Sequence, residues 1–237
     1  MADPFEAWQR RRREKDSTAG IVELYQLAAK ARGISVEQLT EVDRKQLWSR
    51  ALPVLEPGYE VIHGSDRAEQ DSIEVVPYDG DWPAQFEAWK AKLFGVLEGS
   101  PRIEHVGSTS VPGLPAKPVI DIQVSVPDIS DESAYVPPIE SIGIQFRSRD
   151  DQHRYFRPFS GLPRSVQVHV CNMGSEWERR HLLFRDFLRA DTRAKDEYLA
   201  VKRQAAVLWR DDRIAYADAK TEVIERLMRR ARVWKRS

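Results

Sequence analysis

Hydrophobic residues recur with a helical period over the first part of the chain. One stripe has the three- and four-residue spacing of a single helix face: Ile21, Leu24, Tyr25, Leu27 and Ala28. Gly33 is placed to end that helix, and "SVEQ" at residues 35–38 supplies a capping pattern for the next one. Because a further amphipathic piece covers residues 47–52, we predict a helical N-terminal extension over residues 1–65.

The pattern changes after the polar stretch "HGSDRAEQDS" at residues 63–72, which predicts a linker or a long turn. Strands are predicted beyond it by period-two alternation or by continuous apolar character: residues 72–78, the surroundings of Ile103, and residues 119–126, 141–146, 154–159 and 165–172. Asp81 can cap a helix, Ser175 and Glu178 form a capping box for another, and two more helices follow. We therefore predict a second domain over residues 72–237 that has a mixed α/β centre and a helical tail.

Charge and composition exclude several classes of protein. The 237 residues hold 37 Lys plus Arg and 37 Asp plus Glu, so no global field recruits nucleic acid or anionic lipid. Cys171 is the only cysteine, which excludes an intramolecular disulfide and a multi-cysteine metal site. The N-terminus lacks the apolar core of a signal peptide, and no run of about 18 apolar residues could span a membrane. We expect a cytoplasmic protein with neither a membrane nor a nucleic-acid partner.

The stretch "GSTS" is the first candidate for chemistry. Gly107 lets backbone N–H groups approach a ligand, while Ser108, Thr109 and Ser110 add hydroxyl donors, so the turn suits phosphate oxygens. The alternative is an ordinary structural turn, because Gly and Ser are frequent in turns that bind nothing. A P-loop is excluded, since G-x-x-x-x-G-K-[ST] does not occur in the chain.

An apolar strand bearing one carboxylate follows the turn. Asp121 lies in "VIDIQVSV", where an unpaired charge is costly, and Gln123 points to the same face two residues later. Paired carboxylates in this arrangement hold divalent metal, so Asp121 and Gln123 are candidate Mg²⁺ ligands, although Gln brings no negative charge. His169 in "SVQVHV" could stand beside Asp121 as a base or a second ligand. The alternative for His169 is an interior histidine bonded to a neighbour.

Basic side chains could complete a phosphate site. Lys117 directly precedes the carboxylate strand and Arg154 flanks a later hairpin, so these two are the best candidates for contact with phosphate. Most arginines in so charged a chain are simply solvated. Arg185 and Asp186 could contact substrate, but the more economical interpretation is an internal ion pair.

The turn, the carboxylate strand and a later segment together resemble the GrpB family of nucleotidyltransferase-like proteins. The stretches "IEHVGSTSVPGLPAKPVIDI" and "LLFRDFLRA" carry the likeness, which covers roughly residues 72–230 and leaves the helical extension outside. The resemblance implies an α+β fold of the DNA-polymerase-β type, in which a mixed β-sheet is flanked by helices. In that superfamily a Gly-Ser turn holds a nucleoside triphosphate and the next strand brings two carboxylates for metal, with a third on a later strand.

Carried over to this chain, Gly107 and Ser108 match the turn and Asp121 matches the first carboxylate. Gln123 departs from the second carboxylate, and His169 occupies the place of the third. The phosphate-binding half of the pattern is better preserved than the metal-binding half. GrpB-like domains also occur fused to dephospho-coenzyme A kinase, which suggests a supporting role.

Two hypotheses of function follow. The first is an enzyme that transfers a nucleotidyl group to a small molecule, with a nucleoside triphosphate and Mg²⁺, using Asp121 and His169 in catalysis. The second is a catalytically degenerate domain that serves as a binding or scaffold protein and contacts a protein partner through the helical extension. DNA binding by the helix-turn-helix-like segment at residues 28–39 is a third and weaker hypothesis.

Overall fold

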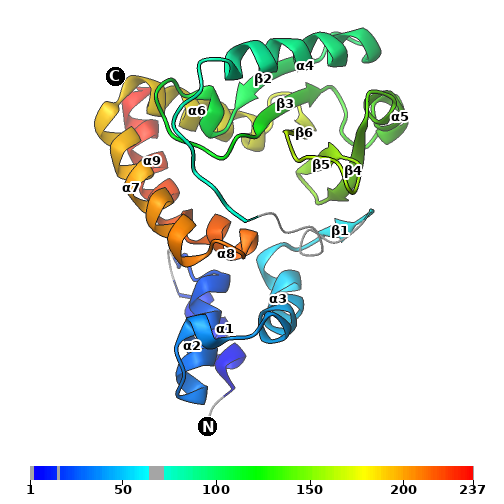
Figure 1. Cartoon of the computed structure of the whole chain (residues 1–237). Coiled ribbons are helices and arrows are strands. Elements are labelled where there is room, and N and C mark those ends of the chain that lie inside the picture. Colours follow the sequence, from blue (N-terminus) through cyan, green and yellow to red (C-terminus); the bar gives the residue numbers. More distant parts are fainter. Residues whose placement is uncertain (1–2, 15–16, 64–71, 237) are drawn as a thin grey trace.

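A six-stranded mixed sheet forms the centre of the molecule (Figure 1). The computed structural model describes residues 3–14, 17–63 and 72–236. The strands are ordered β1-β4-β5-β6-β3-β2 in the sheet. Their bounds are β1 Glu60–Val61, β2 Arg102–Val106, β3 Ile120–Val126, β4 Ile144–Arg149, β5 His153–Pro158 and β6 Val166–Asn172. β3 and β6 run parallel and the other neighbouring pairs run antiparallel.

The sheet has one apolar and one polar face because β3 and β6 alternate in the same phase. Ile122 lies opposite Val168 in the register and Gln123 lies opposite His169, so apolar residues share one face and polar residues share the other. The apolar face packs against α4 (Trp82–Val96) and α5 (Val136–Ser141) in the main hydrophobic core. The polar face is therefore left for the C-terminal helices and the site.

Four helices make up the C-terminal part: α6 Glu176–Ala190, α7 Thr192–Leu208, α8 Arg213–Asp218 and α9 Thr221–Trp234. Ser175 accepts a hydrogen bond from the backbone N–H of Glu178, which is one half of the predicted capping box. The carboxylate of Glu178 instead accepts from the backbone N–H of Gly174 and from Arg102. The last predicted helix is in fact two, because the chain breaks between α8 and α9. α6, α7 and α9 share a hydrophobic cluster with Val111 and Leu114, which anchors the segment just after the "GSTS" turn.

The N-terminal extension is mostly helical, and it ends in the short strand β1, which the sequence did not predict. It contains α1 (Pro4–Arg12), α2 (Ile21–Arg32), a short 3-10 helix (Val36–Gln38) and α3 (Glu41–Leu55). Gly33 ends α2 in a left-handed conformation with φ +67°. A second hydrophobic cluster joins the extension to the helical tail, since Trp8, Tyr25 and Leu47 share it with residues of α7 and α8.

The expected strand over residues 72–78 is wrong. The structure has only an isolated bridge between Val76 and Ala116 in this segment. Ile73 packs into the cluster of the extension, whereas Val76 and Tyr78 pack against the core of the sheet. The alternating apolar residues thus connect two cores instead of following one sheet edge. Most of the predicted linker at 63–72 lies outside the described residues.

Asp81 stands at the N-terminus of α4, but its side chain makes no capping hydrogen bond. The fold class is nonetheless the predicted one, an α+β protein with a mixed sheet flanked by helices and a helical extension. None of the helices in the described ranges is long and apolar enough to cross a bilayer.

Candidate functional site

The Gly-Ser turn lies directly against Asp121. Val106, the last residue of β2, is the register partner of Asp121 on β3, so Gly107 begins the turn beside that carboxylate. Gly107 has φ +66° and ψ −170°, and a Cβ added there would lie 2.2 Å from Oδ2 of Asp121. Glycine is required here because any side chain would collide with the carboxylate and adopt an unfavourable backbone conformation.

The three hydroxyls of the turn all interact with other groups of the protein. Thr109 donates its hydroxyl hydrogen to the carbonyl of Val119 at 3.1 Å, and Ser110 donates to the carbonyl of Gly107 at 2.6 Å. Both side chains are buried. The side chain of Ser108 interacts with the hydroxyl of Tyr198, where it opposes the rise in the Tyr198 pKa that burial causes. Phosphate binding by Thr109 and Ser110 stays a prediction, and their contacts are those of the structural-turn alternative.

Asp121 is surrounded by three lysines. Burial has the largest effect on the pKa of Asp121 and raises it to about 6. The positive charges of these lysines, Lys117, Lys220 and Lys202, lower this pKa. Burial, followed by the charge of Lys220, lowers the pKa of Lys117 to about 7, and burial lowers that of Lys220 to about 8. The pKa of Lys202 is also lowered by burial, and its ammonium donates a hydrogen bond to the carbonyl of Pro115 at 2.8 Å. The group holds more potential positive than negative charge.

Lys202 and Lys220 were not predicted from the sequence. Each follows a tyrosine by four positions. Tyr198 and Lys202 both lie on α7 and share a helix face, whereas Lys220 lies in the turn between α8 and α9, four positions after Tyr216. The ammonium of Lys220 lies 4.0 Å from the ring centroid of Tyr216, and that of Lys117 lies 5.2 Å from the same ring. The repeated Tyr-x-x-x-Lys spacing on apolar stripes was the signal that could have revealed them.

His169 does not lie level with Asp121. The register of β3 and β6 pairs Asp121 with Gln167 and Gln123 with His169, so His169 is displaced by two residues along the strand, about 7 Å. Gln123 is fully buried, and its Nε2 donates to Ser125 at 3.5 Å. Its Oε1 has no hydrogen-bond partner among the described residues. The predicted pairing of His169 with Asp121 is therefore replaced by a pairing with Gln123.

His169 belongs to a stack of rings on the polar face. Its ring centroid lies 5.7 Å from that of His153, 5.3 Å from that of Tyr155 and 5.6 Å from that of Trp177. Burial, followed by the nearby His153 and His181, lowers the pKa of His169 well below its ordinary value. The imidazole is therefore neutral at pH 7, and its Nδ1 makes no hydrogen bond within the described part of the chain.

The structure does not bring Arg154 to this site. Its register partner is Val170, so its side chain lies on the apolar side of the sheet, where its Nε bonds Glu132 at 2.5 Å. Alternation along β5 is the physical reason, because Tyr155 takes the polar face. Arg185 forms the ion pair considered above, with Asp186 at 2.8 Å, and a second one with Glu104 at 2.7 Å.

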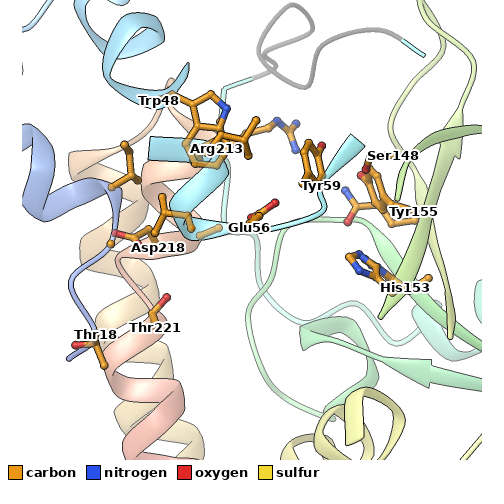
Figure 2. Close-up of a pocket in the computed structure, with 18 of the residues that line it drawn as sticks. Thr18, Trp48, Glu56, Tyr59, Ser148, His153, Tyr155, Arg213, Asp218 and Thr221 are labelled. Atoms are coloured by element: carbon orange, nitrogen blue, oxygen red, sulfur yellow. The ribbon is translucent and has the colours of Figure 1, made fainter. Parts of the chain in front are cut away.

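A cavity of about 880 Å³ opens on the polar face, between the sheet, the extension and the C-terminal helices (Figure 2). Its volume lies within the range typical of small-molecule sites. Its wall includes Lys117, Gln167 and His169, whereas Asp121 is not among its lining residues. Among the residues that the structure describes, five lysines or arginines and three acidic residues line it: Arg12, Lys117, Arg164, Arg213 and Arg229, with Glu56, Asp218 and Glu225. An anionic ligand suits such a wall.

The residues around Asp121 do not fit a resident two-metal centre. Such centres need several carboxylates or imidazoles, and no group of three or more His, Cys, Asp or Glu in the described ranges could hold a metal ion. Three neighbouring lysines further disfavour a divalent cation. Binding of Mg²⁺ by Asp121 and Gln123 stays a prediction, and the chemistry of this donor set is that of an anion site.

Comparison with known proteins supports the same fold. The model of the family described as "GrpB protein" matches residues 72–230. A UPF0157 protein of Halalkalibacterium halodurans is 40% identical over 174 residues, which cover 73% of this chain and 89% of that protein. A dephospho-CoA kinase of Mycolicibacterium paratuberculosis is 31% identical over 189 residues, which cover 68% of this chain and 46% of that protein. The crystal structure of conserved protein GrpB from Enterococcus faecalis matches with a TM-score of 0.60 and 30% identity, over 68% of this chain and 99% of that one.

Proposed function

The chain belongs to the GrpB family, and from that premise we propose that its cavity binds a nucleotide or another phosphorylated small molecule as the substrate of a nucleotidyltransferase-like reaction. The observation that carries the proposal is Lys117. Lys117 lines the cavity and is one of the three lysines near Asp121.

The electrostatics of the lysine group favour an anionic ligand. Burial is the main reason that the pKa of Lys117 falls to about 7, and the nearby positive charge of Lys220 lowers it further. A phosphate at Lys117 would add negative charge where it is lacking and favour the protonated lysine. Arg164 and Arg213 line the same cavity and suit bidentate contact with phosphate oxygens.

The transfer step would use His169 as a base. A neutral imidazole at the cavity wall can accept the proton of an acceptor hydroxyl. The acceptor oxygen would bond to the α-phosphorus as the bond to the pyrophosphate oxygen breaks. Pyrophosphate would leave with the bonding electrons, and Lys117 would stabilise the developing charge.

Calorimetric titration with the four common nucleoside triphosphates, with and without Mg²⁺, tests the proposal. We expect binding by the intact chain and a loss of at least about tenfold in affinity for Lys117→Met, because a charged hydrogen bond is removed. Lys92→Met is the matched control, since Lys92 packs on Trp89 of α4, on the other side of the sheet. Absence of binding by all four nucleotides to folded protein would reject the proposal.

A second candidate is a binding domain without catalysis. Its supporting observation is Gln123, which stands where nucleotidyltransferases of this superfamily have a carboxylate that binds metal. The Gln123 side chain is fully buried beside Ser125. This candidate predicts the same binding, but no pyrophosphate release with any acceptor tested and no effect of Asp121→Asn on function in the cell. Pyrophosphate release that is abolished by His169→Ala supports the enzyme instead.

A further inference from the structure

The N-terminal extension is attached to the molecule on both sides of the cavity. On one side, the backbone N–H of Val22 at the start of α2 donates to Oδ2 of Asp218 on α8 at 2.9 Å. Gly20 permits this approach, because a Cβ there would lie 1.7 Å from Oδ1 of Asp218. On the other side, β1 pairs with the sheet edge at β4, and Glu60 bonds Arg149 at 2.7 Å. The extension thus bridges the space between the C-terminal helices and the sheet.

Residues of the extension form one wall of the cavity. Trp48, Leu52 and Leu55 of α3 and Tyr59 before β1 contribute aromatic and aliphatic surface. The facing wall belongs to the sheet and contains Ser148, His153, Tyr155 and His169. Figure 2 shows Tyr59 and Tyr155 on opposite walls of the same part of the cavity. Ring-bearing residues therefore border the cavity from both sides, whereas Lys117 and Arg164 supply positive charge.

We infer that the extension supplies the recognition wall for a flat aromatic ring, so that the ligand of this cavity is a phosphorylated compound carrying such a ring, with the ring between Tyr59 and Tyr155 and the phosphates at Lys117. The placement of the phosphates at Lys117 rests on the proposed function. The placement of the aromatic ring rests on the residues of the cavity wall alone. It is independent of the family, since residues 1–65 lie outside the range matched by the family model. Stacking of a base on an aromatic side chain is strong enough to be measured and tolerates different bases.

The experiment compares ATP with inorganic tripolyphosphate by calorimetry on the full chain. We expect the intact protein to bind ATP at least about fivefold more tightly than tripolyphosphate, the increment expected of one stacked base. Tyr59→Leu and Tyr155→Leu should remove that advantage and leave tripolyphosphate affinity within about twofold. Tyr59→Phe should keep it, because the ring is retained. Trp89→Leu on α4 is the control for loss of an aromatic side chain away from the cavity.

The outcomes separate the two claims. Equal affinity for ATP and tripolyphosphate in the intact protein overturns the ring-binding wall and leaves the phosphate site standing. Equal weakening of both ligands by Tyr59→Leu also overturns it, because that result indicates a structural effect. Absence of binding by either ligand rejects the proposed function and the wall together.

Discussion

Replacement of Gly107 by alanine tests the contact on which the site is built. The added Cβ would lie 2.2 Å from Oδ2 of Asp121 and 2.8 Å from its Cγ, far inside van der Waals contact. The backbone at φ +66° and ψ −170° costs a non-glycine residue about 1–3 kcal/mol. Crowding of a packed site adds about 1–3 kcal/mol, because the buried Asp121 lies directly against the glycine. We expect a loss of about 2–6 kcal/mol in the free energy of unfolding.

Urea unfolding followed by circular dichroism measures this loss as a shift in the midpoint at constant slope. Gly99→Ala is the matched control, because Gly99 has φ +74° and nothing within 4 Å of its would-be Cβ, so only the backbone cost remains. In the double variant Gly107→Ala/Asp121→Ala, part of the clash disappears. We expect the double variant to lose less free energy of unfolding than the two single variants lose in sum, by at least about 0.5 kcal/mol. Equal losses for the two glycine variants, with additivity in the double variant, would refute the reasoning.

Three further predictions concern charge and capping. Burial lowers the pKa of Lys220 to about 8 in the folded state, against an ordinary 10.5, so the unfolded chain binds more protons than the folded one between pH 8 and 10.5. The free energy of unfolding should therefore rise over this range by about 1–2 kcal/mol more in the intact protein than in Lys220→Met. Urea unfolding at each pH measures this difference. Triphosphate affinity should fall as pH rises through 7 to 8, because Lys117 and Lys220 lose protons, and calorimetry in buffers of different ionisation enthalpy should record proton uptake on binding; pH-independent affinity would contradict this. Asp218→Ala should lower the free energy of unfolding by about 0.5–2 kcal/mol, because the N-terminus of α2 loses its cap, whereas Asp211→Ala at an exposed position should change it little. Equal melting temperatures of these two variants would exclude a stabilising cap.

Local patterns predicted the elements that depend on nearby residues. The helix ended by Gly33, the strands β2 to β6 and the helix capped at Ser175 all follow from periodicity and capping, which are short-range, whereas β1 was not predicted. The segment at 72–78 was mistaken for a strand because an alternating pattern shows that residues are buried without showing what covers them. Ile73 and Val76 are indeed buried or half-buried, but in different cores.

The candidate site depended more heavily on long-range packing. The sequence indicated Gly107, Asp121 and His169 as polar residues in unusual places, and all three lie on or beside the polar face. It could not place Lys202 and Lys220 near Asp121, because they come from the helical tail, about 80 and 100 residues later, whose packing sets the distance. Arg154 was misplaced for a related reason, since a strand's alternation decides which face a side chain takes only once its neighbours are known.

By itself, the sequence determined the family, the α+β class and the presence of a carboxylate beside a Gly-Ser turn, since these follow from local periodicity and contiguous motifs. Only the tertiary structure decided that three lysines surround that carboxylate and that the extension walls the cavity. The physical reason is that burial and electrostatic interaction depend on which groups meet in space. A buried lysine interacts with a carboxylate or borders a cavity only when another element brings them to it.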